Sequence, residues 1–181
     1  MRNIKLVSIF LSALLLAPAT FAAGVEVFLK DRLDGNLSQY CIDIMGGFAN
    51  IDPSRGIQAH TCLGYQGQFG TDQVLDSERF IAGEFKFPEF DVCITLESTE
   101  PDALASLTSC DGSDAQNIVF TANGNISPVS APNMCMTVGD ETSFGRGGTS
   151  PHQIRTLTLQ LCSAELATRQ EWTTRNQPQA E

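Results

Sequence analysis

The chain has 181 residues, with 21 acidic side chains against 11 basic ones and a formal charge of −10. Such an acid excess repels phosphate backbones, so we expect no nucleic-acid partner. No stretch after the N-terminal apolar run is apolar enough to span a bilayer, so we expect no membrane insertion. The sequence contains no HExxH, GxSxG or P-loop pattern and only two histidines. These motifs carry much of the recognisable hydrolase and nucleotide chemistry, so we expect a binding protein and not an enzyme.

The first 22 residues have the pattern of a secretory signal peptide. Arg2 and Lys5 form a basic head, an apolar run from Leu6 to Ala17 follows, and Thr20-Phe21-Ala22 offers small residues for cleavage. The run is shorter than the roughly 20 residues of a membrane span, although a retained N-terminal anchor helix is the alternative. Cleavage would leave 159 residues with a formal charge of −12, since the leader holds two basic and no acidic side chains. We expect one domain, secreted or periplasmic.

All six cysteines follow this leader, at Cys41, Cys62, Cys93, Cys110, Cys135 and Cys162. An even number behind a signal peptide indicates three disulfides in an oxidising compartment, and six cysteines allow 15 pairings. No two of them lie within two to four residues of each other, as zinc motifs require. We therefore expect neither a metal site nor a cofactor.

Residues 23–172 consist of short alternating runs separated by Gly, Pro, Asn and Asp, without a convincing helix, which predicts an all-β sandwich or barrel. One unit recurs three times. Each copy begins with Cys, apolar, polar, apolar: Cys41-Ile-Asp-Ile, Cys93-Ile-Thr-Leu and Cys135-Met-Thr-Val. A second strand ending in Cys follows, and then a Gln with an apolar residue two positions on: Gln73-Val-Leu75, Gln116-Asn-Ile118 and Gln170-Glu-Trp172.

Two copies continue into a further expected strand, over Phe80–Phe90 and over Phe120–Ile126 with a turn at Asn123-Gly124. The third copy has no sequence left for one, and the lead-in strand at 25–30 could supply it and close a ring. Three such units predict a pseudo-threefold barrel without exposed edges. Residues 173–181 are polar and are expected to form a disordered tail.

The threefold order of Cys, Cys and Gln resembles the ricin B-type, or QxW, β-trefoil lectin family over about Gln39 to Trp172. The full Gln-x-Trp motif occurs only at Gln170-Glu171-Trp172. The resemblance implies a β-trefoil with the two cysteines of each repeat bonded, each bond worth roughly 3 kcal/mol. The implied pairs are Cys41–Cys62, Cys93–Cys110 and Cys135–Cys162. The apolar third residues Leu75, Ile118 and Trp172 should fill the core.

The resemblance also implies a sugar site in the first repeat. Its residues would be Asp43, Gln58, His60, Asp72 and Gln73. A carboxylate can accept bonds from two neighbouring hydroxyls, and an amide both donates and accepts. His60 departs from the aromatic residue that the family usually has, and it could make binding pH-dependent near its ordinary pKa of about 6.5. The alternative is that Asp43 is only a turn acid, Gln58 and His60 are surface polar residues, and Asp72 is a strand-end acid. Thr95 and Thr137 replace the acid in the other repeats, where we expect no site.

The function expected from this resemblance is binding of carbohydrate, a galactose-like or other neutral glycan, through one site. The first alternative is a protein-interaction trefoil, such as a protease inhibitor, that contacts its partner through the Gly-rich insertion 144–152. Deleting that loop should abolish activity under this alternative and spare sugar binding. The second alternative is a degenerate structural trefoil in which Asp43→Ala changes no binding.

Overall fold

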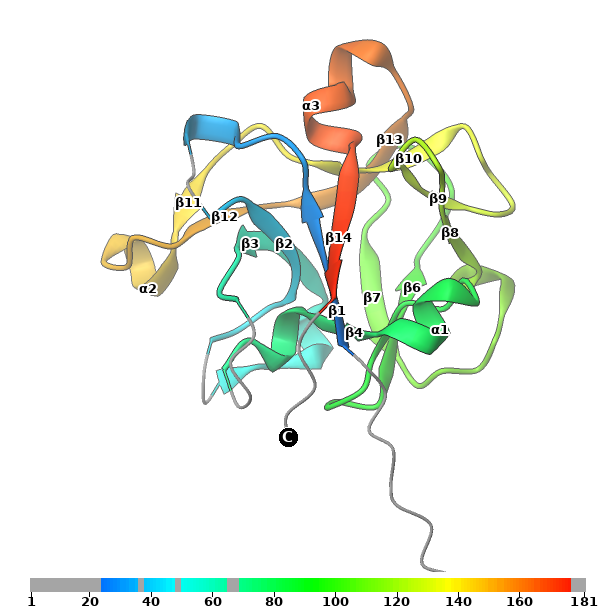
Figure 1. The fold of residues 1–181 in the computed structure, drawn as a ribbon, viewed down its shortest axis with the longest axis horizontal. Coiled ribbons are helices and arrows are strands. Elements are labelled where there is room, and N and C mark those ends of the chain that lie inside the picture. Colours follow the sequence, from blue (N-terminus) through cyan, green and yellow to red (C-terminus); the bar gives the residue numbers. More distant parts are fainter. Residues whose placement is uncertain (1–23, 36–37, 48–49, 65–68, 177–181) are drawn as a thin grey trace, which may run out of the picture.

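The computed structural model describes residues 24–35, 38–47, 50–64 and 69–176, and its described part is built mainly of short strands (Figure 1). The expected signal peptide and residues 177–181 lie outside the described residues. The strands are β1 (Gly24–Leu29), β2 (Tyr40–Ile44), β3 (Ile57–Thr61), β4 (Val74–Asp76), β5 (Lys86–Phe87), β6 (Val92–Leu96), β7 (Ala105–Thr108), β8 (Ile118–Phe120), β9 (Ile126–Pro128), β10 (Met134–Val138), β11 (Ser143–Phe144), β12 (Gln153–Arg155), β13 (Leu157–Leu161) and β14 (Trp172–Asn176).

Three antiparallel strand pairs repeat around the molecule and define three lobes: β2 with β3 in the first, β6 with β7 in the second, and β10 with β13 in the third. One disulfide closes each lobe, between Cys41 and Cys62, Cys93 and Cys110, and Cys135 and Cys162. These are the pairs that the resemblance implied. The architecture is an all-β β-trefoil, as predicted.

The lead-in strand joins the end of the third repeat to the first lobe, where the sequence suggested it could lie. β1 lies antiparallel to β14, with Leu29 opposite Trp172 and Val25 opposite Asn176, and it also pairs with β2 and β4. The two strands run side by side through the centre of Figure 1. The tail predicted from residue 173 therefore begins too early. Arg175 donates to the buried Glu26 at 2.7 Å and its guanidinium lies 5.0 Å from the centre of the Phe28 ring, which holds this polar strand in place.

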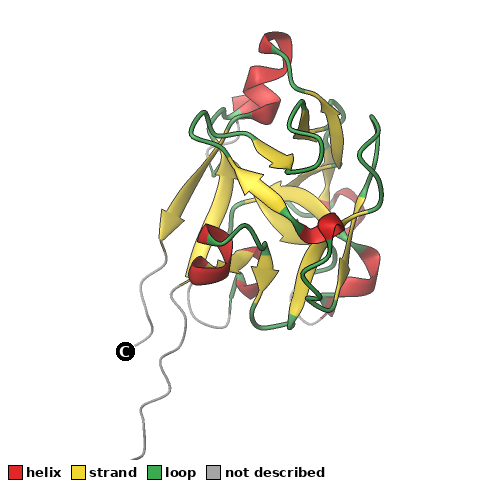
Figure 2. Cartoon of the chain, turned by 90° about the vertical axis from the view of Figure 1, so that its right-hand side faces the viewer, coloured by secondary structure: helices red, strands yellow, loops and turns green. Residues whose placement is uncertain are grey.

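The helical segments are short and lie at the periphery (Figure 2): α1 (Ser77–Ile81), α2 (Gly145–Gly148) and α3 (Ala167–Gln170), with 3₁₀ turns at Leu33–Gly35, Pro53–Arg55, Thr71–Gln73, Asp114–Gln116 and Ala164–Leu166. The strand predicted over Phe80–Phe90 is wrong for most of its length. Asp76 accepts from the backbone N–H groups of Glu78 and Arg79 at 3.0 and 3.1 Å, so a helical turn begins there. The predicted turn at Asn123-Gly124 is confirmed, between the paired strands β8 and β9.

The core contains the three residues that end the Gln-x-apolar motifs. Leu75, Ile118 and Trp172 are all buried. The indole N–H of Trp172 donates to the carbonyl of Met136 at 3.1 Å. The backbone N–H of Trp172 donates to the carbonyl of Gly124 at 2.7 Å. Gly124 has a φ of +91°, and a Cβ there would lie 2.5 Å from the Trp172 carbonyl oxygen, so glycine is required at this close approach. The third lobe is thereby fixed to the β8–β9 hairpin.

We expect Trp172→Ala to lower the free energy of unfolding by about 3–5 kcal/mol, because it opens a cavity and leaves the Met136 carbonyl without its donor. Tyr40→Phe is the control. Tyr40 is fully buried and its hydroxyl has no hydrogen-bond partner among the described residues, so its loss should be neutral or stabilising. Urea unfolding measures the free energy of unfolding of both variants. A similar decrease in Trp172→Ala and Tyr40→Phe would contradict the prediction.

Candidate functional site

A glutamine side chain connects the two halves of each lobe in the same way. Its amide oxygen accepts a hydrogen bond from the backbone N–H of the residue after the second cysteine. Its amide nitrogen donates to the backbone carbonyl of the residue before that cysteine. The oxygens of Gln73, Gln116 and Gln170 accept from Leu63, Asp111 and Ser163 at 2.8, 2.9 and 3.0 Å. The nitrogens donate to the carbonyls of Thr61, Ser109 and Leu161 at 3.2, 3.0 and 3.0 Å.

The same amide nitrogen also donates to the side chain two residues after the first cysteine. The acceptors are Asp43 at 2.8 Å, Thr95 at 3.0 Å and Thr137 at 2.8 Å. A threonine hydroxyl therefore satisfies the glutamine in two lobes. Only the first lobe places a carboxylate there, so the shared fold does not require the acid.

Asp43 lies on β2 opposite Gln58 of β3, and the two side chains are in contact. The Gln58 amide donates to Oδ1 of Asp43 at 2.7 Å, while Gln73 holds Oδ2. Asp43 is 1% exposed. Burial raises the pKa of this carboxyl well above its ordinary value, the nearby Asp72 carboxylate raises it further, and the two glutamine bonds oppose the shift. A proton or a ligand hydroxyl near Asp43 would lower the cost of burying its charge.

His60 and Asp72 border this pair. Nδ1 of His60 lies 2.8 Å from the carbonyl of Thr61 and 3.9 Å from Oδ2 of Asp43. Burial lowers the pKa of His60, the Thr61 carbonyl opposes this, and His152 adds to it, so the ring is neutral at pH 7. In the neutral ring, Nδ1 donates to the Thr61 carbonyl, and Nε2 is the ring nitrogen left to accept a hydrogen bond. Asp72 is buried in the turn before Gln73, and burial raises its pKa as well.

The five residues expected from the sequence thus come from β2, β3 and the turn Thr71–Gln73 and lie together. The other lobes present hydroxyls instead. Thr95 shares a 2.7 Å hydrogen bond with Thr108, and Thr137 donates to the carbonyl of Cys135 at 2.8 Å.

Sequence reasoning missed that the third lobe reaches the first-lobe residues. The hairpin formed by β11, α2 and β12 is an insertion between β10 and β13, and β12 pairs with β3, with Ile154 opposite His60. Gln153 donates its backbone N–H to the Thr61 hydroxyl at 2.8 Å. The rings of His60 and His152 meet edge to face with their centres 5.3 Å apart. No local pattern in the Gly-rich insertion predicts which strand it pairs with.

Among the residues that the structure describes, one group has the side chains for a metal ion: Glu84 with Cys93 and Cys110. These two sulfurs form a disulfide and are not thiolates, so the group is not a metal site. In the same residues, no helix has the length and apolarity needed to cross a membrane.

No family model matches the sequence, and no curated protein matches it. Solved structures do match. The mdaA-1 domain aligns with 87% of this chain and 92% of its own, at a TM-score of 0.57 and 15% identity. The agglutinin from Abrus precatorius aligns with 90% of this chain and 51% of its own, at a TM-score of 0.55 and 17% identity. An earthworm lectin C-terminal domain mutant, in complex with 6'-sialyllactose, aligns with 86% of this chain and 99% of its own, at a TM-score of 0.50 and 10% identity.

These likenesses support the fold, which is the β-trefoil that the sequence predicted.

Asp43→Thr copies the arrangement seen at Thr95 and Thr137, and we expect it to fold and to equal or exceed the wild type in stability at pH 7. Because the pKa of Asp43 is raised on folding, its favourable contribution is fully present below about pH 3.9 and is lost as the pH rises through the raised pKa. The stability of the variant relative to wild type should therefore rise between pH 4 and pH 7.

Urea unfolding across this pH range measures the difference, and the His60 titration largely cancels because both proteins retain it. Asp31→Thr, at an exposed position, is the matched control for the replacement of an aspartate by threonine. A loss of more than about 2 kcal/mol for Asp43→Thr at pH 7 would show that the fold requires the carboxylate.

Proposed function

We propose that this chain is a secreted carbohydrate-binding protein with one sugar site, in the first lobe, built from Asp43, Gln58, His60, Asp72 and Gln73. The observation that carries this proposal is the carboxylate of Asp43. Threonine serves the same fold position in the other two lobes. A buried carboxylate costs free energy, so its presence where the fold does not need it points to a binding role.

The chemistry of sugar binding fits the hydrogen bonds of Asp43. A carboxylate has about four acceptor positions, and Gln58 and Gln73 occupy two of them. In the proposed complex a sugar hydroxyl replaces Gln58 at Oδ1, while Gln73 keeps Oδ2 in place. The released Gln58 amide then bonds a neighbouring hydroxyl of the sugar. Asp72 and Nε2 of His60 can also bond sugar hydroxyls.

Charge favours a neutral sugar, galactose-like or otherwise, over an acidic one. The Asp72 carboxylate lies close enough to Asp43 to raise the pKa of Asp43. An anionic ligand would meet like charge in a buried setting, where repulsion is weakly screened. Among the matched solved structures, the earthworm lectin C-terminal domain mutant is in complex with a glycan, 6'-sialyllactose. The three disulfides fit secretion into an oxidising compartment.

A protein partner at the 144–152 loop is the second candidate, favoured by the exposure of Phe144 at the protruding β11–α2–β12 hairpin. Because β12 pairs with β3 of the first lobe, deleting the loop would also disturb the sugar site and would not separate the two functions. Phe144→Ser alters the exposed hairpin and leaves the paired strand β12 intact, so it can separate them.

We expect saturation-transfer NMR of the mature protein to detect at least one neutral monosaccharide, and Asp43→Thr to abolish the signal, because a threonine hydroxyl bonded to Gln73 has no second oxygen for the sugar. Phe144→Ser should leave the signal unchanged. Transfer that survives in Asp43→Thr would place the sugar elsewhere, and absence of transfer from a full panel of neutral sugars would sink the lectin proposal.

A further inference from the structure

The β11–β12 hairpin is attached to the first lobe although it belongs to the third. Besides the β12–β3 pairing, Arg155 at its base donates to Thr142 at 2.9 Å and to the carbonyl of Gly139 at 2.7 Å. Its guanidinium lies 5.6 Å from the centre of the Tyr40 ring, and Arg155 is 7% exposed. These contacts fix the position of β12 beside the candidate site.

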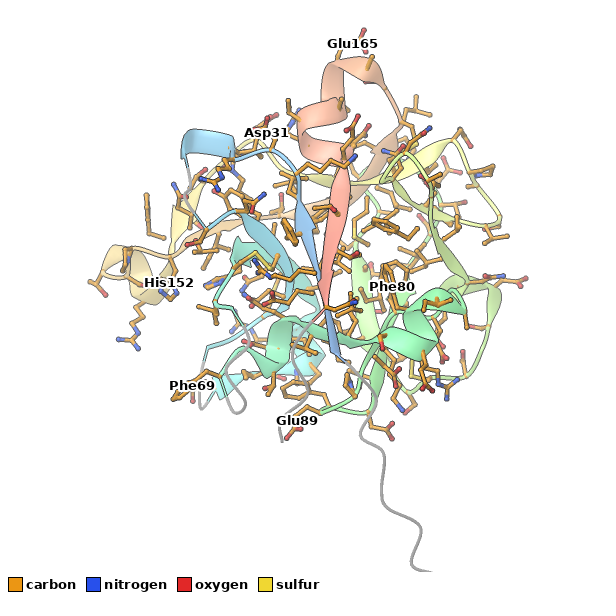
Figure 3. The ribbon with its side chains drawn as sticks, viewed as in Figure 1. Asp31, Phe69, Phe80, Glu89, His152 and Glu165 are labelled. Carbon is orange, nitrogen blue, oxygen red and sulfur yellow. A yellow bond between two sulfur atoms is a disulfide. The ribbon has the colours of Figure 1, made fainter. Side chains whose placement is uncertain are left out.

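His152 is held at the site end of this hairpin by its own backbone. Its N–H contacts the Ser150 hydroxyl at 3.3 Å, and its carbonyl accepts from Gly145 at 2.9 Å. Arg146 and Gly147 at the tip have positive φ values of 52° and 61°, so the segment labelled α2 is a tight turn that returns the chain to His152. The side chain of His152 lies next to the α2 ribbon in Figure 3.

Asp43, His60 and His152 form a series of increasing exposure. Asp43 is 1% exposed and His60 is 9% exposed, whereas His152 is only half-buried. Oδ2 of Asp43 lies 3.9 Å from Nδ1 of His60, and the His60 ring centre lies 5.3 Å from that of His152. A ligand whose terminal sugar bonds Asp43 would therefore extend outward past His60 toward His152.

We infer that the β11–β12 hairpin forms the outer wall of the first-lobe sugar site, and that His152 makes the site select glycans of two or more units over monosaccharides. This inference rests on the proposed function. The terminal unit bonds Asp43, and the second unit lies against the imidazole of His152, which offers a flat face and a hydrogen-bonding edge. The site is thus shared by two lobes, and His152 is its specificity-determining residue.

The test compares a monosaccharide with a disaccharide in three proteins: the wild type, His152→Ala, and Arg146→Ala as a control at the tip of the same hairpin. The probes are methyl β-galactoside with lactose, and methyl β-glucoside with cellobiose, titrated by NMR. We expect His152→Ala to weaken the disaccharide about five- to tenfold, the size of one good contact, and the monosaccharide less than about twofold. Arg146→Ala should change neither.

A second readout reports the hairpin contact without any ligand. Since His152 lowers the pKa of His60, His152→Ala should raise the His60 pKa in an NMR titration of its ring proton. An unchanged His60 pKa would overturn the hairpin wall. Equal weakening of both sugars, or of neither, would overturn selection by His152 while leaving the sugar site intact. Failure of the wild type to bind any of the four probes would overturn this inference, and failure with the full panel of neutral sugars would overturn the proposed function as well.

Discussion

The bridging glutamine amide is the interaction on which the rest of the structure depends. Each lobe is a strand pair with a disulfide, too small to bury a core alone. Gln73, Gln116 and Gln170 each bind the backbone on both sides of the second cysteine, and so fix the direction in which the chain leaves the strand. The apolar residue two positions later then enters the core, where Leu75, Ile118 and Trp172 meet the shared interior.

This arrangement allows the residue two positions after the first cysteine to differ between lobes. The amide nitrogen needs an oxygen two residues after the first cysteine, and either a hydroxyl or a carboxylate supplies it. Threonine does so without charge. Aspartate adds acceptor capacity but carries the cost of a buried charge, which its raised pKa reflects. The difference between Asp43 and the two threonines is therefore chemical, within one unchanged backbone geometry.

A feature of the fold could be predicted from the sequence when it depends on residues that lie close together in the chain. The disulfides and the buried third residues depend on a repeated order of residues, which is visible in the chain, and the structure confirms them. The β12–β3 pairing joins segments about 95 residues apart through backbone bonds, which any sequence can make. The strand at 173–176 was missed for a similar reason, since the polar side chain of Arg175 is held by Glu26 and Phe28, which lie near the opposite end of the chain.

The burial of Asp43 also limits how a sugar can be held. In the proposed complex, a hydroxyl that bonds Oδ1 would replace a 2.7 Å bond from Gln58, so the net gain would be an exchange of one hydrogen bond for another and would be small. A terminal sugar at this site would bind weakly. Additional affinity would have to come from surface beyond the hydrogen bonds of Asp43, and the half-buried His152 on the neighbouring hairpin is the surface that we propose for it. Under the proposed function, the lobe that carries Asp43 would therefore depend on another lobe for the length of glycan that it retains.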